Sequence, residues 1–393
     1  MPKTIARREV LAGLGALPLV SCLKDYVPDN IPSVEVPEGP GLDALARKSG
    51  RRFGSAVAWN AKGKGMSVSN PAYAAILNAE CGVIVPENEM KWQTLRPSPD
   101  SYDFTAMDKI AAWAATNGQE LRAHVLLWHR PEWFPDWLNS YDFGARPASE
   151  AERLLSEHID TVAARYGSQI KSWDVVNEAI DHSARAPIET SLSRAMGSPE
   201  AVIDLAFHKA REALPNARLV YNDYMSWEPS HAHHCEDVLR LLEGMRARGV
   251  PCDTLGIQSH IEMFELDPET GVGVYDEAGW RRFLDEVTGM GYRLLITEFD
   301  VKDKALPAPI AQRDAKVAEY AQHYLELMLD YNEHLDDILV WGMVDAYNWL
   351  QYFDPASRAD GLEVRGAPYD SSYRPKPLRE AIATVLADVS QVP

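Results

Sequence analysis

Two acidic side chains stand at the ends of two apolar segments in this 393-residue chain. The segment 171–178 ends in Asn177 and Glu178, and the segment 293–300 carries Glu298 near its end. A strand that is buried on both faces should be apolar throughout, so a carboxylate at its exit is a candidate catalytic group. Two carboxylates that face each other across a cleft meet the requirement for hydrolysing a glycosidic bond.

Both acids belong to a pattern of eight strand-like segments that alternate with amphipathic helical patterns. The expected strands are 53–58, 82–88, 121–128, 170–178, 218–223, 254–260, 293–299 and 338–345. Helical patterns between them include 151–166, 201–214, 236–248 and 311–331. Eight β-then-α units predict an α/β fold, a TIM (β/α)8 barrel that forms a single catalytic domain. In such a barrel the strand ends share one face, so Glu178 and Glu298 would lie across one mouth.

Polar and aromatic side chains stand at the ends of most expected strands. They are Glu87, Asn88 and Lys91 after the second, His124 and Trp128 in the third, Tyr224 after the fifth, Gln258 and His260 in the sixth, and Trp341 and Trp349 around the eighth. Hydrogen-bonding groups and indoles around one mouth suit a polyhydroxylated ligand.

The composition limits the kinds of partner. A formal net charge of −19 argues against nucleic acid and anionic membrane surfaces, and is compatible with a neutral polymer. The four cysteines, Cys22, Cys81, Cys235 and Cys252, show no CxxC spacing, so neither a zinc site nor a redox motif is indicated. A Cys235–Cys252 disulfide and buried free thiols both remain open.

The first 22 residues predict export. Arg7 and Arg8 precede a short apolar run, which resembles a Tat signal, and the run ends in a lipobox-like motif at Cys22. An ordinary signal peptide with an incidental cysteine is the alternative. Residues 23–41 form a proline-rich tether, and residues 42–390 form the barrel domain. No other stretch is long and apolar enough to be transmembrane.

Five motifs together resemble the family 10 glycoside hydrolases, the endo-1,4-β-xylanases, from about Leu42 to the C-terminal helix. The motifs are ENEMKW at 87–92, WDVVNE at 173–178, GIQSH at 256–260, ITEFD at 296–300, and Trp341-Gly342 with Asp345. The resemblance implies a TIM barrel, no required metal and retention of anomeric configuration, and we expect no cofactor. The implied substrate is β-1,4-xylan or xylo-oligosaccharides. We expect an exported monomer that attaches to a membrane only through a lipidated Cys22.

The resemblance also assigns roles. Glu178 would be the acid/base and Glu298 the nucleophile, with their carboxyl groups about 5–5.5 Å apart. His260 and Asp300 would hold Glu298 ionised, and Asn177 would bond the sugar 2-hydroxyl. The implied substrate-binding residues are Glu87, Asn88, Lys91, His124 and Trp128 on the glycone side, Gln258 near the nucleophile, Trp341 and Trp349 as a roof, and Tyr224 on the aglycone side.

Three positions depart from the family pattern. The family usually has a glutamine after the Trp-His pair, whereas Trp128-His129 is followed here by Arg130. Arg130 would bond sugar hydroxyls or an acidic branch, or else pair at the surface with a neighbouring acid. Met225 replaces a common asparagine, and Asn348 replaces a common serine.

Three other readings remain open. Another retaining barrel β-glycanase, acting on cellulose or mixed-linkage glucan, would share both acids. A non-catalytic sugar-binding barrel would need no carboxylate pair. A metal-dependent hydrolase would use His124, His129, His260 and Asp300, although these lack the clustered spacing of metal ligands.

Overall fold

A computed structural model describes residues 34–388 of the chain. The predicted export signal, including Cys22, and residues 23–33 of the predicted tether lie outside the described residues. All described residues belong to one compact unit. Within this part of the chain, the helices are too short or too polar to cross a membrane.

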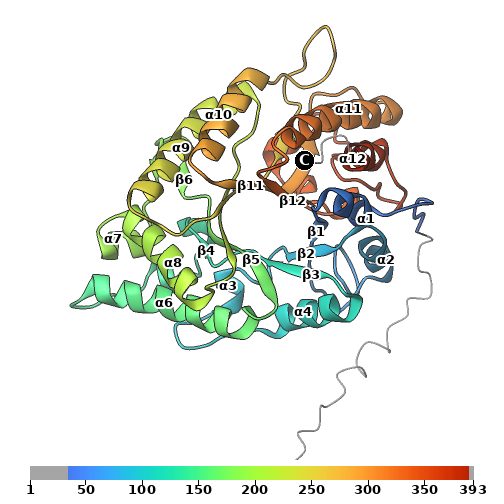
Figure 1. Ribbon diagram of the computed structural model, residues 1–393. Coiled ribbons are helices and arrows are strands. Elements are labelled where there is room, and N and C mark those ends of the chain that lie inside the picture. The colour runs from blue at the N-terminus through green and yellow to red at the C-terminus, as the bar shows by residue number, and fades with distance from the viewer. Residues whose placement is uncertain (1–33, 389–393) are drawn as a thin grey trace, which may run out of the picture. The chain divides into compact units, whose positions relative to one another are not determined.

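Eight parallel strands close a ring at the centre of this unit (Figure 1). The pairing order is β1-β2-β3-β5-β8-β9-β11-β12, and β12 pairs with β1 to complete the ring. The strands are β1 (Phe53–Val57), β2 (Val83–Pro86), β3 (Glu120–Ala123), β4 (Leu127–Trp128), β5 (Ile170–Asn177), β6 (Ile180–Asp181), β7 (Ala186–Pro187), β8 (Arg218–Asp223), β9 (Thr254–Ile257), β10 (His260–Glu262), β11 (Arg293–Lys302) and β12 (Leu335–Val340). This ring confirms the predicted TIM barrel.

Helices surround the strands, as Figure 1 shows. They are α1 (Leu42–Ala46), α2 (Pro71–Glu80), α3 (Trp92–Leu95), α4 (Thr105–Asn117), α5 (Asp136–Asn139), α6 (Pro147–Tyr166), α7 (Ser191–Met196), α8 (Pro199–Ala213), α9 (Ala232–Ala247), α10 (Glu277–Gly289), α11 (Ile310–Leu329) and α12 (Pro377–Ala387). Short 3₁₀ helices lie at Arg47–Ser49, Pro131–Trp133, Pro229–His231, Asp345–Tyr347, Trp349–Gln351 and Asp354–Ala356.

Local sequence explains where several of these helices begin. The Asn70 side chain accepts hydrogen bonds from the first free backbone N–H groups of α2, and Pro71 occupies the first turn, where no N–H is needed. Ser198 and Pro199 begin α8 in the same way. These caps fix the ends of the helices that pack on the barrel.

The strand β5 shows how the barrel combines an apolar core with a polar interior. Trp173, Val175 and Val176 are fully buried, and burying each such side chain contributes about 1.5–3 kcal/mol. Asp174, between them, accepts hydrogen bonds from the guanidinium of Arg122 on β3. The buried charge of Asp174 is therefore paired with that of Arg122, which offsets the cost of removing it from water.

Two predicted strands are interrupted in the structure. The segment 121–128 divides into β3 and β4, because the backbone N–H of Leu126 donates to the Asp174 carbonyl outside the regular ladder. The segment 254–260 divides into β9 and β10 at Ser259, whose φ is 62°. The predicted eighth strand is shifted, since β12 ends at Val340. These irregularities lie where side chains turn toward the barrel mouth.

The described cysteines are free. Cys81, Cys235 and Cys252 are buried thiols, so the Cys235–Cys252 disulfide alternative was wrong. Burial raises the pKa of Cys252 to about 12, which keeps this thiol protonated. These cysteines contribute to packing and not to a cross-link.

Candidate active site

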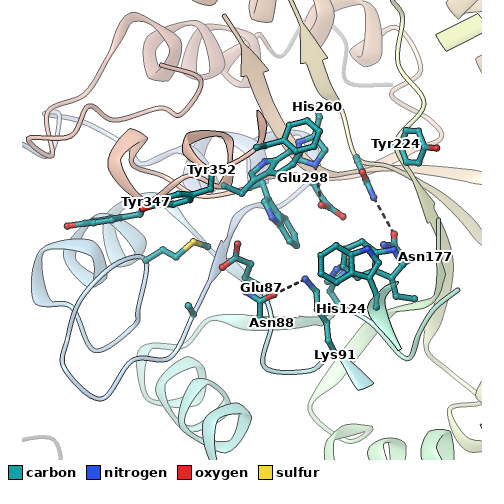
Figure 2. A pocket seen from close by; sticks show the side chains of 18 of the residues that line it. Glu87, Asn88, Lys91, His124, Asn177, Tyr224, His260, Glu298, Tyr347 and Tyr352 are labelled. Atoms are coloured by element: carbon teal, nitrogen blue, oxygen red, sulfur yellow. Dashed lines mark hydrogen bonds and ion pairs between the residues drawn. The ribbon is translucent and has the colours of Figure 1, made fainter. Parts of the chain in front are cut away.

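A cavity of about 850 Å³ opens at the C-terminal ends of the barrel strands. It is lined by Glu178 and Glu298 and by every substrate-binding residue that the sequence predicted. Figure 2 shows Glu87, Lys91 and Asn177 around the same space as Glu298. Asp300 does not line the cavity but lies behind it, hydrogen-bonded to His260. The structure thus brings the whole predicted set together.

Glu298, on β11, is held by hydrogen bonds on both carboxylate oxygens. Its Oε1 accepts from Asn222 Nδ2 at 2.7 Å, and its Oε2 lies 3.3 Å from His260 Nε2. Burial opposes ionisation, but the hydrogen bond and charge of His260, the charge of His124 and the bond from Asn222 outweigh it and lower the pKa of Glu298. Glu298 is therefore kept as a bare carboxylate.

His260 is oriented by two further residues. Its Nδ1 lies 2.8 Å from Asp300 Oδ1, and Trp349 Nε1 donates to Asp300 Oδ2 at 2.7 Å. Burial disfavours the imidazolium, but Asp300 and Glu298 raise the pKa of His260 to about 9. A protonated ring can donate to both carboxylates at once.

Glu178 follows the last residue of β5 and has a left-handed backbone, with φ of 51°. Its N–H donates to the Asn222 carbonyl at 2.9 Å, which fixes this uncommon conformation. Gln258 Nε2 donates to Glu178 Oε1 at 2.9 Å. Burial raises the pKa of Glu178 above its ordinary value, against the opposing effects of Arg130 and Gln258. The side chain is therefore suited to carry a proton.

Asn222, at the end of β8, links the two acids. Besides the bond to Glu298, its Nδ2 lies 2.9 Å from Asn177 Oδ1, and its Oδ1 accepts from Thr297 Oγ1 at 2.7 Å. Asn222 lies at the polar end of the predicted fifth strand, but the sequence assigned it no role. Its position between two carboxylate-bearing strands becomes visible only when the barrel closes.

One wall of the cavity consists of Lys91 and aromatic rings. Lys91 Nζ donates to Asn88 Oδ1 at 2.8 Å and lies 4.6 Å from the centre of the Trp128 ring. Trp133 stacks on Trp128 with ring centres 4.4 Å apart. Burial lowers the pKa of Lys91, while the charge of Glu87 opposes this change. The wall offers a rigid apolar face with one cation.

Two further tryptophans, Trp341 and Trp349, line the cavity, and Asn348 supports them from behind. Trp341 packs edge-on against His124, with ring centres 5.2 Å apart. Asn348 donates to the Trp341 carbonyl at 3.1 Å and accepts from the Leu350 N–H at 2.9 Å. Asn348 thus supports the loop that carries Trp349, so this departure from the family pattern is structural. Met225 is fully buried in the core and does not line the cavity.

Several cavity residues were missed by sequence reasoning. These are Ala58, Trp59, Asn60, Lys64, Gly65, Met66, Trp133, His231, Lys302, Tyr347, Tyr352 and Phe353. Tyr352 is 82% exposed at the rim. Most lie in loops after the strands, where the sequence carries no periodic signal. Only the cluster of aromatic residues in 347–353 could have indicated them.

Arg130 also lines the cavity and is no surface residue. Its Nε lies 3.1 Å from Glu178 Oε2, and its side chain is 21% exposed. Arg130 does pair with a neighbouring acid, but inside the cavity and not at the surface, and that acid is the candidate proton donor.

The residues of the metal alternative do not converge. His124 Nδ1 lies 2.9 Å from Asp174 Oδ2, and the buried His129 bonds through Nε2 to the Ile188 carbonyl. His260 is held by Asp300 and Glu298, as described above. Among residues 34–388, no group of three His, Cys, Asp or Glu side chains is arranged to bind a metal.

Several known proteins are similar to this chain in both sequence and fold. A β-1,4-xylanase from Dictyoglomus thermophilum is 30% identical over 316 residues, covering 77% of this chain and 82% of that protein. Endo-1,4-β-xylanase B from Thermotoga neapolitana is 29% identical over 317 residues, covering 80% of this chain and 84% of that protein.

A solved structure, xylanase 10B from Thermotoga petrophila RKU-1 in complex with xylobiose, superposes with a TM-score of 0.75 at 29% identity. It covers 90% of this chain and 98% of the solved chain. The model of glycosyl hydrolase family 10 matches residues 41–385. The chain therefore belongs to glycosyl hydrolase family 10.

Proposed function

We propose that this protein is a retaining endo-1,4-β-xylanase, with Glu298 as nucleophile and Glu178 as acid/base. One observation carries the proposal: two carboxyl groups, a buried Glu298 and a mostly buried Glu178, line one cavity in opposite environments. His260 and Asn222 favour an ionised Glu298, whereas burial favours a protonated Glu178. This division of labour is what double displacement needs. The similarity to xylanases, one of them solved with xylobiose, supports xylan as the substrate.

In the first step, a Glu298 oxygen attacks the anomeric carbon and forms a glycosyl ester. The bond to the leaving oxygen breaks, and Glu178 gives its proton to that oxygen. The shorter chain leaves with a new hydroxyl group. The negative charge of Glu298 has now passed to Glu178.

In the second step, Glu178 removes a proton from water, and the resulting hydroxide attacks the anomeric carbon. The ester bond to Glu298 breaks, so Glu298 regains its charge and Glu178 its proton. Two inversions at one carbon give net retention. Asn177, next to both acids, would bond the sugar 2-hydroxyl in the oxocarbenium-like transition state.

The indole and lysine side chains of the cavity would favour xylose over glucose. Xylose lacks the hydroxymethyl arm of glucose, and Trp341, Trp128 and Lys91 all line the cavity, where they would crowd that arm. We propose that this steric difference excludes glucan chains. Aryl xylobioside should then be turned over faster than aryl cellobioside, and a preference for the cellobioside would contradict the steric argument.

We propose from sequence alone that the protein is exported, through the twin-arginine segment before residue 22. A lipidated Cys22 would be its only membrane attachment. We also expect a monomer. Mass determination of the mature protein, and its release by detergent but not by salt, would test the anchor.

Product analysis on xylan and on β-glucan tests the proposed function. The wild type should release xylo-oligosaccharides from xylan, and Glu298→Ala should reduce turnover by several powers of ten while the protein remains folded. Glucan as the better substrate would favour another β-glycanase. Sugar binding without turnover in the wild type would indicate a non-catalytic barrel.

A further inference from the structure

Arg130 is anchored independently of the acid it faces. Its Nη2 donates to the Ile180 carbonyl and to the Tyr224 hydroxyl, both at 3.2 Å. Its guanidinium also lies 5.6 Å from the centre of the Tyr224 ring. These contacts hold the positive charge in place whatever the protonation state of Glu178.

The contact between Arg130 and Glu178 is a charge contact and not an aligned hydrogen bond. Nε lies 3.1 Å from Oε2, yet this Nε makes no hydrogen bond of normal geometry. Glu178 Oε1 is already bonded to Gln258. Oε2 is therefore the oxygen left to carry the mobile proton, and it faces a fixed cation.

Charged groups from several elements act on Glu178. Besides Arg130 in the loop after β4, these groups are Asp223 at the end of β8, Glu298 on β11 and Lys91 before α3. Burial raises the pKa of the neighbouring Tyr224, so this phenol stays neutral. Asp223 and Glu298 favour the protonated acid, whereas Arg130 favours the carboxylate. Of these groups, only Glu298 loses its charge in the proposed reaction, when it becomes an ester.

We infer that Arg130 is a positioning residue for Glu178, a fixed positive charge that stabilises the carboxylate form which Glu178 needs as a base once the glycosyl ester has removed the charge of Glu298. The inference rests on the proposed double displacement. In the free enzyme, Glu298 and Asp223 oppose Arg130, and burial keeps Glu178 protonated. In the ester, the charge of Glu298 is gone, so Arg130 is opposed by Asp223 and by burial but no longer by Glu298, and the balance shifts toward the carboxylate that activates water.

The pH profile of Arg130→Met tests this role, because methionine keeps an unbranched apolar stem and removes the charged guanidinium. The alkaline limb of kcat/KM on xylotriose should move up by about half a pH unit or more. A second substrate, 2,4-dinitrophenyl β-xylobioside, isolates the second step, because its leaving group needs no proton and hydrolysis of the ester limits turnover. The kcat of Arg130→Met on this substrate should be about threefold or more below that of the wild type near neutral pH. Arg130→Lys should restore most of both effects.

Arg153→Met on α6 is the matched control, since it removes one exposed positive charge that does not line the cavity. It should leave the profile unchanged. An unmoved alkaline limb and unchanged kcat in a folded Arg130→Met, checked by thermal unfolding, would overturn the inference. So would an Arg130→Lys that behaves like Arg130→Met. If the wild type turned over no xylotriose at all, the proposed function would fail instead.

Discussion

At the scale of single residues, the environment of each carboxyl group determines its role. Glu178 and Glu298 are the same residue type, and both line one cavity. Glu298 accepts hydrogen bonds from Asn222 and His260, which stabilise its charge. Glu178 accepts from the amides of Gln258 and Asn177 on one oxygen, and an arginine faces its other oxygen without an aligned bond. The difference lies in these partners and not in the acids themselves.

Removal of Glu178 should separate the two steps of the reaction. We expect Glu178→Ala to lose about 10²–10⁴-fold in xylan turnover, the usual contribution of a general acid/base. An aryl xylobioside with a good leaving group should still form the ester, because no proton is needed for departure. Added azide should then restore turnover by attacking the ester directly. Equal losses on both substrates, with no azide rescue, would contradict this assignment.

The pH dependence follows from the two opposite pKa shifts. Activity needs an ionised Glu298, so kcat/KM should fall as the pH drops through a pKa below 4.5. Activity also needs a protonated Glu178, so it should fall as the pH rises through a pKa above 4.5. The profile of the wild type should be bell-shaped. In Glu178→Ala, measured with the activated substrate, the alkaline limb should disappear, and its persistence would assign that limb to another group.

At the scale of elements, the close approach of neighbouring strands positions the acids. Gly256 on β9 leaves room for Asn222 on β8, because a Cβ at this position would lie 2.4 Å from Asn222 Oδ1. A side chain here would push Asn222 away from Glu298. The glycine of the GIQSH motif therefore has a packing role beside the polar residues that follow it.

Gly256→Ala should damage both stability and activity. We expect a loss of about 1–3 kcal/mol in the free energy of unfolding from overpacking, together with a lower kcat. Gly289→Ala, at the end of α10, is the control, since a Cβ there meets nothing within 4 Å. Urea unfolding and xylotriose kinetics would measure both effects. A Gly256→Ala variant with wild-type stability and kcat would contradict the proposed packing role, because it would show that Asn222 tolerates a Cβ at this position.

The positions of most strands were predictable from the sequence, because a buried strand is an apolar run and the polar residues at its C-terminal end mark where it stops. The fifth strand, Arg218–Asp223, was predicted with its observed bounds. The break between β3 and β4 was not, since it depends on backbone contacts with Asp174, about 50 residues away. The contact of Arg130 with Glu178 was equally hidden, because it depends on loops folding over the barrel mouth.

At the scale of the whole molecule, a buried ionic cluster joins the two ends of the barrel domain. Glu80, at the end of α2, accepts hydrogen bonds from Arg379 on α12 at 2.9 and 3.1 Å. It also accepts from the Leu42 N–H at the start of α1, at 2.8 Å, and from the Tyr369 hydroxyl. The cluster closes the outer layer where the first and last helices meet.

Arg379→Met should strongly destabilise the fold, because it leaves Glu80 charged and unpaired in the interior. We expect a loss of about 3–5 kcal/mol in the free energy of unfolding. Arg374→Met, which breaks a more exposed pair with Asp370, should cost no more than about 1 kcal/mol. Adding Glu80→Gln to Arg379→Met should recover part of the loss. If Arg379→Met and Arg374→Met lowered the free energy of unfolding equally, burial of the Glu80 cluster would not be the source of its contribution to stability.

The central claim is that Glu298 forms a covalent bond with the sugar, and trapping the ester tests it most directly. The enzyme would be incubated with 2,4-dinitrophenyl 2-deoxy-2-fluoro-β-xylobioside, which slows the second step, and then digested and analysed by mass spectrometry. We predict one equivalent of released phenolate and a fluoroxylobiosyl adduct on the peptide at Glu298. An adduct on Glu178 or elsewhere, or steady turnover without any adduct, would contradict the account.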